Sequence, residues 1–452
     1  MTRLRARMPS HEELRGQLAE LIGIPSVSAD PSHAGDVVAA AGWVADRIRA
    51  AGGSADAAPW NGGRPLVLGA IPASERPEAA PTVLCYAHFD VQPPDPLDLW
   101  ESPPFELAER DGWLYARGVA DDKAHLFMLI EAARQLSEAG ELPVNLRFSF
   151  DSEEEVGGQS IVDWVAADEG GADAAIVLDG GMVERGRPIF YTALRGLCYF
   201  HVRVRTGERD LHSGMYGGVA LSATHALIQA LSGVIARDGL LPEPLRVGIE
   251  PPSAAELEDW KALPAGGEKI DLAGARAMDP RAAEDFYVRT GAEPSLDVHG
   301  LAGGSPDLIK TVLPVEARAN VSIRIVPGQT VAEVTEAFDR LVRESAPDGA
   351  EIEITPSSSG EPASIDVTTR AVELGLEAFE SAVGVRPLLA RVGGSIPVVS
   401  ALCAKNVPVL ATGFALEESN VHSPNERLPA EYLTLGVETV RELYVRLGEL
   451  GR

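Results

Sequence analysis

The chain has 452 residues, which is long for a single domain, so its length predicts two domains. Hydrophobic residues make up 45% of the sequence, enough to bury a large core, and this excludes general disorder. The 39 basic residues against 67 acidic ones give a net charge of −28, which argues against binding to nucleic acid or to anionic membranes.

The first part of the chain alternates between helical patterns and short apolar runs. A capping box of Ser10 and Glu13 begins the first helical pattern, and Gly52 ends the second. Further along, we expect strands at 83–90, 145–151 and 174–179 and helices at 123–136 and 160–167. Apolar runs of this length are typical of buried parallel strands, so the alternation predicts a layered α/β domain.

The pattern changes near Thr192. The following residues predict a half-exposed strand, a helix, a long irregular segment and a strand–helix–strand unit, at 197–206, 218–232, 251–310, 321–327, 330–344 and 351–355. We interpret residues 192–359 as a smaller α+β domain inserted into the first, with Ser357–Gly360 as the linker back. The first domain is then discontinuous and consists of residues 1–191 and 360–452.

Cysteine usage indicates the compartment. Cys85, Cys198 and Cys403 are odd in number, far apart and flanked by apolar residues, which predicts core packing, no disulfide framework and a reducing environment. The first residues carry three arginines without a following apolar stretch, and no run is long enough to span a bilayer. We therefore expect neither a signal peptide nor a membrane span, and we predict a cytoplasmic location.

Residues that can bind metal ions stand at the ends of the predicted strands or in the loops after them. They are His88, Asp90, Asp121, Asp122, Asp151, Glu153–Glu155, Asp179 and His422. In open α/β sheets the carboxyl ends of the strands form the binding crevice. Carboxylates that converge there repel one another unless cations neutralise them, and two histidines with several carboxylates suit zinc or manganese. The sequence therefore predicts a dinuclear site in which one carboxylate is shared between two ions.

The remaining polar residues of these segments are expected to be structural. A single histidine in a helix or strand is more often a core or surface residue than a ligand, and we assign His125, His201 and His225 to that class. We interpret Lys123 as an ion-pair partner of Asp122 that holds the ligand loop.

Nine motifs follow one another along nearly the whole chain: YAHFDVQP (86–93), ARGVADDKA (116–124), SEEEVGG (152–158), VLDGG (177–181), DLHSGMYGG (210–218), KTVLP (310–314), SIRIVP (322–327), GGSIPV (393–398) and VHSPNE (421–426). In this order they resemble the M20 family of metallopeptidases, and most closely its dipeptidase branch, which includes the carnosine and non-specific cytosolic dipeptidases. The resemblance implies that residues 1–191 and 360–452 form a catalytic domain with a mixed sheet flanked by helices. It also implies that residues 192–359 form a lid and dimerisation domain.

The resemblance implies a ligand set for two divalent metal ions, with zinc favoured and manganese as the alternative. His88 and Asp179 would bind one ion, and Glu155 and His422 would bind the other. Asp121 would bridge the two.

Two further residues would support this centre. Asp90 would hydrogen-bond His88 and fix its tautomer, and Glu154 would be the general base that deprotonates the bridging water. The resemblance also implies a non-proline cis peptide bond between Asp121 and Asp122.

Residues outside the metal centre would bind the substrate. Arg324 would bind the substrate carboxylate, helped by Thr311 and Ser395. His212 would reach the active site of a partner subunit and help to stabilise the oxyanion, so the expected assembly is a homodimer.

The implied reaction is hydrolysis of the peptide bond of dipeptides, or of similar small peptides, with a free C-terminal carboxylate. An N-acyl-amino-acid deacylase or a glutamate-type carboxypeptidase would use the same metals and base. A protein of a different class would be a catalytically silent metal-binding or peptide-binding protein on the same scaffold. The presence of Glu154 disfavours the silent protein.

Overall fold

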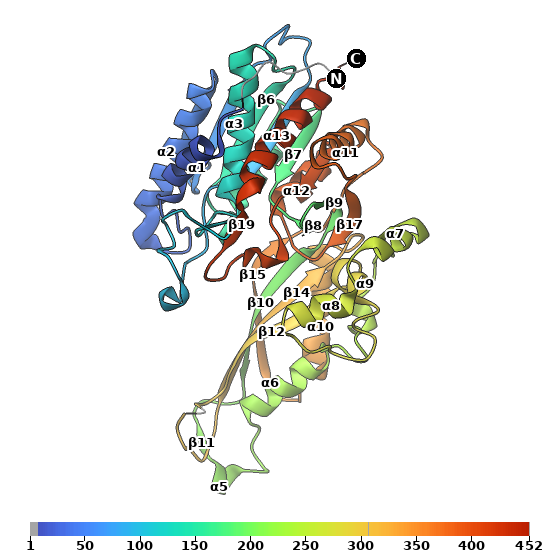
Figure 1. Cartoon of the computed structure of the whole chain (residues 1–452). Coiled ribbons are helices and arrows are strands. Elements are labelled where there is room, and N and C mark those ends of the chain that lie inside the picture. Colours follow the sequence, from blue (N-terminus) through green and yellow to red (C-terminus); the bar gives the residue numbers. More distant parts are fainter. Residues whose placement is uncertain (1–7, 306, 452) are drawn as a thin grey trace. The chain divides into compact units, whose positions relative to one another are not determined.

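The computed structural model describes residues 8–305 and 307–451, and the chain folds into two compact units (Figure 1). The larger unit takes in Met1–Thr192, Ile365–Ala390 and Ile396–Arg452, and the smaller unit takes in Ala193–Ser364 and Arg391–Ser395. The N-terminal arginines, where the sequence predicts no signal peptide, lie outside the described residues. No helix in the described part is both long and apolar enough to cross a bilayer.

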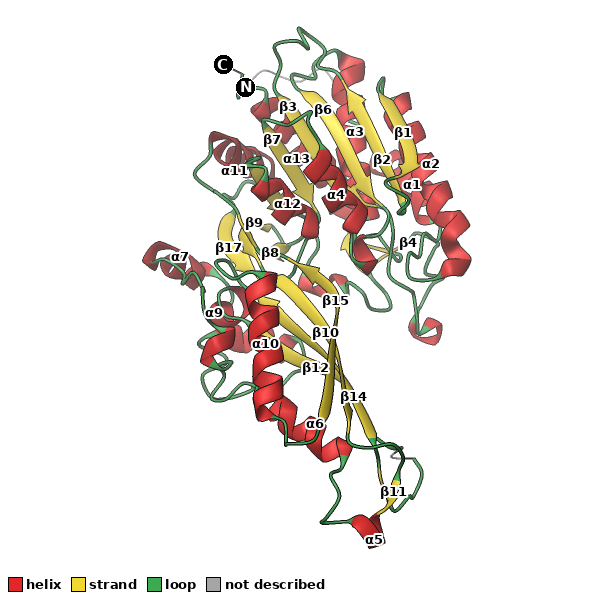
Figure 2. Ribbon diagram, turned by 180° about the vertical axis from the view of Figure 1, so that it is seen from behind, coloured by secondary structure: helices red, strands yellow, loops and turns green. Residues whose placement is uncertain are grey.

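A mixed six-stranded sheet forms the centre of the larger unit (Figure 2). Its strand order is β1 (Ser54–Pro59), β2 (Pro65–Ile71), β6 (Asn145–Asp151), β3 (Thr82–His88), β7 (Ala174–Leu178) and β18 (Val409–Thr412). The last four strands are parallel, and β1 and β2 pair antiparallel at one edge. The parallel strands therefore end at the same edge of the sheet.

Helices cover both faces of this sheet (Figures 1 and 2). One face carries α1 (His11–Ile22), α2 (Ala34–Ala50), α3 (Lys123–Ala139), α11 (Arg370–Val383) and α13 (Ala430–Leu447). The other face carries α4 (Gln159–Ala167) and α12 (Pro397–Ala404). Every residue of β7 is buried because a central strand packs against helices on both sides. The predicted α/β fold class is confirmed.

Short strands form two further sheets. One contains β4 (Ala108–Arg110), β5 (Trp113–Tyr115) and β19 (Arg427–Pro429), and the other contains β8 (Met182–Glu184), β9 (Arg187–Leu194), β16 (Ala363–Ser364) and β17 (Leu388–Val392). The pairing of β19 with β5 is antiparallel. It brings the loop before β19 next to the loop after β5, although about 300 residues separate them in the sequence.

The smaller unit is an antiparallel sheet with helices on one face. The strand order is β12 (Ser295–Ala302), β14 (Glu316–Ile325), β10 (Gly196–Arg205) and β15 (Glu351–Gly360), and α6 (Ala223–Ser232) and α10 (Val331–Ser345) cover one face. At one end lie β11 (Leu211–His212), β13 (Val312–Leu313) and α5 (Ser213–Tyr216). The helices α7 (Ala254–Asp259), α8 (Gly266–Leu272) and α9 (Phe286–Gly291) are short. This is the predicted α+β architecture.

Two details of the sequence interpretation are wrong. Ser357–Gly360 is not a linker, because β15 runs on to Gly360 and pairs with Leu197. An edge strand tolerates serine and proline, which the sequence pattern does not distinguish from a linker. Arg391–Ser395 was assigned to the first domain but packs within the smaller unit, where Arg391 forms an ion pair with Glu256.

Candidate metal centre

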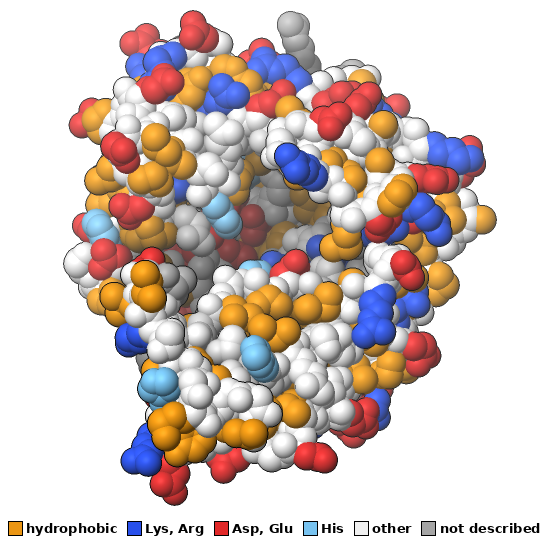
Figure 3. Space-filling model, turned by 90° about the horizontal axis from the view of Figure 1, so that it is seen from below, with side chains coloured by type: hydrophobic (Ala, Val, Ile, Leu, Met, Phe, Trp, Pro, Cys, Tyr) orange, Lys and Arg blue, Asp and Glu red, His pale blue; other side chains and the backbone are white. Residues whose placement is uncertain are grey.

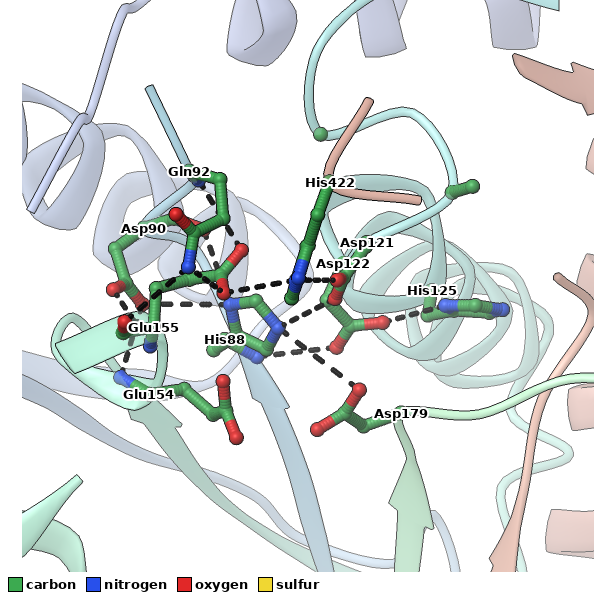
Figure 4. Close-up of polar contacts among 12 residues, drawn as sticks. His88, Asp90, Gln92, Asp121, Asp122, His125, Glu154, Glu155, Asp179 and His422 are labelled. Atoms are coloured by element: carbon green, nitrogen blue, oxygen red, sulfur yellow. Dashed lines mark hydrogen bonds and ion pairs between the residues drawn. The ribbon is translucent and has the colours of Figure 1, made fainter. Parts of the chain in front are cut away.

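The candidate ligands of the larger unit stand at the ends of three neighbouring strands. β3 ends at His88, β6 leads into a 3₁₀ turn at Glu154–Val156, and Asp179 directly follows β7. Because these strands are parallel and adjacent, their ends bring the side chains to one edge of the sheet. Figure 4 shows these side chains close together, with His422 reaching them from the loop before β19.

Asp121 lies between the two histidines. Its Oδ1 is 2.9 Å from His88 Nε2, and its Oδ2 is 2.9 Å from His422 Nε2. His422 Nε2 is also 3.1 Å from Glu155 Oε2. The two oxygens of one carboxylate therefore face two separate nitrogen ligands, as expected for a carboxylate shared between two metal ions (Figure 4). The predicted cis peptide bond between Asp121 and Asp122 is present.

Two groups of side chains have the geometry to hold a metal ion. Asp121, Glu155 and His422 form one, and His88, Asp122 and Asp179 form the other, with ligand atoms within 4.8 Å of one another in each. Asp122 is the less suitable ligand of the second group. One of its oxygens accepts a hydrogen bond from the His88 backbone N–H, and the other accepts one from His125. Asp121 Oδ1 lies 2.9 Å from the same His88, so Asp121 is the alternative candidate for the second group.

The electrostatics fit a cationic occupant. Burial, followed by the charge of Asp122, raises the pKa of Asp179 well above its usual range. Burial, followed by the charge of Asp179, raises the pKa of Glu154 in the same way. Hydrogen bonds to Asp121 and then to Glu155 raise the pKa of His422 to about 10. Such a surplus of negative charge favours cations, and a metal ion would displace the proton from His422.

Comparisons with known proteins agree with this geometry. The model of Peptidase family M20/M25/M40 matches residues 84–446. This chain belongs to that family.

Similar proteins include dipeptidases. The chain is 30% identical to the cysteinylglycine-S-conjugate dipeptidase of Corynebacterium striatum, over 92% of each protein. It is 29% identical to the Cys-Gly metallodipeptidase dug1 of Schizosaccharomyces pombe, over 94% of each. The solved structure of the dipeptidase Dug1p from Saccharomyces cerevisiae is 26% identical, with a TM-score of 0.80 and coverage of 97% of this chain and 96% of that one. The resemblance to the dipeptidase branch is confirmed.

In this M20 chain, Asp90 and Gln92 contact His88 and the turn that carries Glu154 and Glu155. Asp90 accepts hydrogen bonds from the backbone N–H groups of Glu154 and Glu155, and its Oδ1 lies 3.4 Å from His88 Nδ1. The same His88 nitrogen donates its hydrogen bond to the Asp90 carbonyl oxygen, at 3.1 Å, so backbone and carboxylate of Asp90 both lie beside it. Gln92 Nε2 donates to Glu155 Oε2 at 2.9 Å. Gln92 was not among the predicted site residues, although it lies in the quoted motif YAHFDVQP.

His125 is structural, as expected, but it serves the metal centre indirectly. Its Nδ1 donates to Asp122 at 2.5 Å, and its Nε2 accepts from the backbone N–H of Phe414 at 2.9 Å. These two contacts fix the neutral tautomer of His125. They also hold the Asp122 carboxylate, which accepts from the His88 backbone N–H. Lys123 was interpreted incorrectly, because its buried ammonium group donates to the backbone carbonyls of Leu21 and Ile24 instead of pairing with Asp122.

The four predicted substrate residues of this M20 chain fall into two groups within the smaller unit. Arg324 donates to Ser395 Oγ at 2.8 Å, and this hydroxyl donates to the Arg195 carbonyl. His212 and Thr311 lie at the other end, where β11 pairs with β13. Arg324 is eight residues beyond Glu316, the first residue of β14, so at about 3.3 Å per residue roughly 26 Å of strand separates the two ends. The smaller unit does not bring the two groups together.

Proposed function

We propose that this protein is a dinuclear metallodipeptidase that hydrolyses the peptide bond of dipeptides with a free C-terminal carboxylate. The observation that carries the proposal is the Asp121 carboxylate, one oxygen of which faces His88 while the other faces His422. The names of the curated relatives support the dipeptide as the substrate class. Three free cysteines fit a reducing compartment, so we propose a cytoplasmic location.

His88, Asp179 and Asp121 would hold one ion, and Asp121, Glu155 and His422 would hold the other. The mixed nitrogen and oxygen ligands favour zinc, and manganese suits the same ligands. Bound divalent ions at such a site supply Lewis acidity and lower the pKa of water.

Glu154 is the proposed general base. Asp90 accepts from the backbone N–H of Glu154 and also contacts His88, so one residue holds both the turn that carries the proposed base and a proposed metal ligand. Its raised pKa suits a group that takes a proton from water and later gives it to the leaving amine. Asp90 acts as a positioning residue in this proposal.

Arg324 is proposed to bind the C-terminal carboxylate, with Ser395 holding its guanidinium. Burial, followed by the charge of Arg324, lowers the pKa of Arg195 to about 10, so the two guanidinium groups form a region of positive charge. A guanidinium matches a carboxylate with two parallel hydrogen bonds.

We expect Arg324→Lys to lower kcat/KM for free dipeptides at least tenfold, about 1.4 kcal/mol, because lysine cannot reproduce the bidentate contact. Steady-state rates on free and C-terminally amidated dipeptides would check this, and amidated dipeptides should be poor substrates that are indifferent to the change. Arg318→Lys, on the same strand, is the control and should match the parent. Equal parental rates on both substrate types would remove Arg324 from the substrate site.

We further propose a homodimer in which His212 serves the partner's active site. His212 Nδ1 accepts from the Gly214 N–H, which leaves the proton on Nε2, where it could be donated to an oxyanion. Exposed hydrophobic side chains follow His212 in the chain or precede its partner strand β13, namely Met215, Tyr216, Val219, Leu308 and Ile309. Hydrophobic side chains also gather on the surface seen from below (Figure 3). Exposed apolar patches of this kind mark association surfaces, and the separation of the two substrate groups supports a second copy as the occupant.

Mixing inactive Asp121→Asn and His212→Ala chains is expected to restore activity. Each heterodimer would combine one intact metal centre with one intact His212, which gives about a quarter of parental activity after random exchange. Dipeptide hydrolysis after verified subunit exchange is the measurement. A mixture of Asp121→Asn and Glu154→Gln is the control and should stay inactive, because every site then carries a lesion. No recovery in the first mixture would contradict a shared site.

A substrate panel tests the proposed activity itself. The metal-loaded protein should release free amino acids from dipeptides, and a chelator should abolish the release. N-acyl amino acids and peptides longer than three residues should react much more slowly. Faster cleavage of N-acyl amino acids than of any dipeptide would overturn the dipeptidase assignment.

A further inference from the structure

We propose that a buried ion pair between Arg117 and Glu426 positions the metal ligands by tying together the loops that carry His88, Asp121 and His422. The proposal rests on the metal centre proposed above. Neither side chain belongs to the two candidate groups of metal ligands, so both are positioning residues.

Glu426 gathers the loop that carries Asp121. Its Oε2 accepts from Arg117 Nη1 at 2.6 Å and from the Gly118 N–H at 3.0 Å, and its Oε1 accepts from the N–H groups of Ala120 at 2.8 Å and Asp121 at 3.1 Å. The side chain is fully buried. The hydrogen bond to the Asp121 amide fixes the backbone from which the bridging carboxylate projects.

Glu426 also stands in the loop that carries His422. His422 lies four residues before Glu426, has a positive φ of 62° and exposes 52% of its side chain, so its own packing does little to hold it. The Glu426 carbonyl accepts from the Ala116 N–H at 3.1 Å. Backbone and side chain of Glu426 thus join two ligand loops that are about 300 residues apart in the sequence.

Arg117 connects these two loops to the segment that follows His88. Its Nη2 donates to the carbonyl of Pro93, five residues after His88, at 3.3 Å, and to the carbonyl of Ser423, next to His422, at 3.5 Å. Arg117 is 1% exposed. Arg117 stands in the loop that leads to Asp121, and its guanidinium contacts the segments that follow His88 and His422, because its planar group presents donors in several directions.

The local backbone is shaped for this contact. Gly118 has a φ of 84°, and a Cβ there would lie 2.7 Å from Val91. The turn lets the N–H groups of Gly118, Ala120 and Asp121 point at one carboxylate. A buried ion pair contributes little to stability compared with apolar packing, so its use between ligand loops indicates a role in orientation.

Binding of Co²⁺ to the metal-free protein, followed by visible absorption, tests the proposal without relying on turnover. Glu426→Gln should raise the apparent Kd for Co²⁺ at least tenfold, within the range of about 10–100-fold typical of residues that orient ligands. The NH₂ group of glutamine would face N–H donors that now bind a carboxylate oxygen, so at least one hydrogen bond would be lost. Saturating metal should restore most of kcat, because the ligands and Glu154 are intact.

Glu131→Gln is the matched control. Glu131 is also a buried carboxylate paired with an arginine, Arg134, but it lies on α3 away from the ligand loops. The Glu131→Gln substitution removes the same charge and should leave the Kd for Co²⁺ unchanged. If Glu426→Gln does not fold, Arg117→Lys serves instead and should also weaken Co²⁺ binding, because lysine keeps the charge but loses the planar fork.

Parental Co²⁺ affinity in the Glu426→Gln or Arg117→Lys protein would overturn the proposal. An equal loss of affinity in Glu131→Gln would overturn it as well, since the effect would then be a general consequence of destabilisation. A parent protein that binds no Co²⁺ would refute the metal centre and the ion-pair role together.

Discussion

Glu154→Gln is expected to lower kcat about 10³-fold, equivalent to about 4 kcal/mol of transition-state stabilisation, while the metal content stays unchanged. Glutamine has the shape of glutamate but cannot take a proton at neutral pH. Glu154 is not one of the side chains that face the two histidines, so its loss should not release metal. Initial rates with a dipeptide and elemental analysis of the purified protein are the two measurements.

Glu153→Gln is the control for this change. Glu153 lies one residue earlier, and its Oε1 accepts from the Ser160 N–H, a contact that the glutamine oxygen can keep. This variant should retain nearly parental kcat. A Glu154→Gln protein with more than a tenth of parental turnover would contradict the role of Glu154 as base.

Asp121→Asn is expected to abolish turnover by releasing at least one metal ion per chain. The amide replaces one of the two oxygens that face His88 and His422, and it removes the negative charge between them. Both groups of ligands are then incomplete. Elemental analysis after dialysis should give less than two metal equivalents.

Asp122→Asn distinguishes the two neighbouring carboxylates. Asp122 accepts from the His88 N–H and from His125, so its amide should keep both metals but weaken their binding, within the range of about 10–100-fold typical of residues that orient ligands. If Asp122→Asn loses metal and Asp121→Asn keeps it, the assignment of the bridging carboxylate is wrong.

The strands that position the centre could be predicted because their chemistry is local. β3, β6 and β7 are short runs of apolar residues followed by polar ones, and their ends agree with the predicted ends to within two residues. The sequence did not predict β1, β2 or β12 as strands. β1 and β12 are largely exposed edge strands, so they have no continuous apolar pattern.

The supporting contacts could not be predicted because they join distant parts of the chain. Lys123 lies beside Asp122 in the sequence, which suggested an ion pair, but its acceptors are carbonyls at the end of α1, about 100 residues away. Arg117 and Glu426 both stand in quoted motifs, yet nothing in the motifs indicates that they pair. The ligand types follow from residue chemistry, whereas the contacts that orient them follow from the tertiary fold.

A metal titration of the metal-free protein, with dipeptide hydrolysis measured at each step, tests the central claim most directly. The account predicts no hydrolysis without metal, and full activity at two equivalents of Zn²⁺ or Mn²⁺ per chain. Hydrolysis by the metal-free protein in the presence of a chelator, or full activity at one equivalent with no further binding, would contradict a centre in which Asp121 joins two ions.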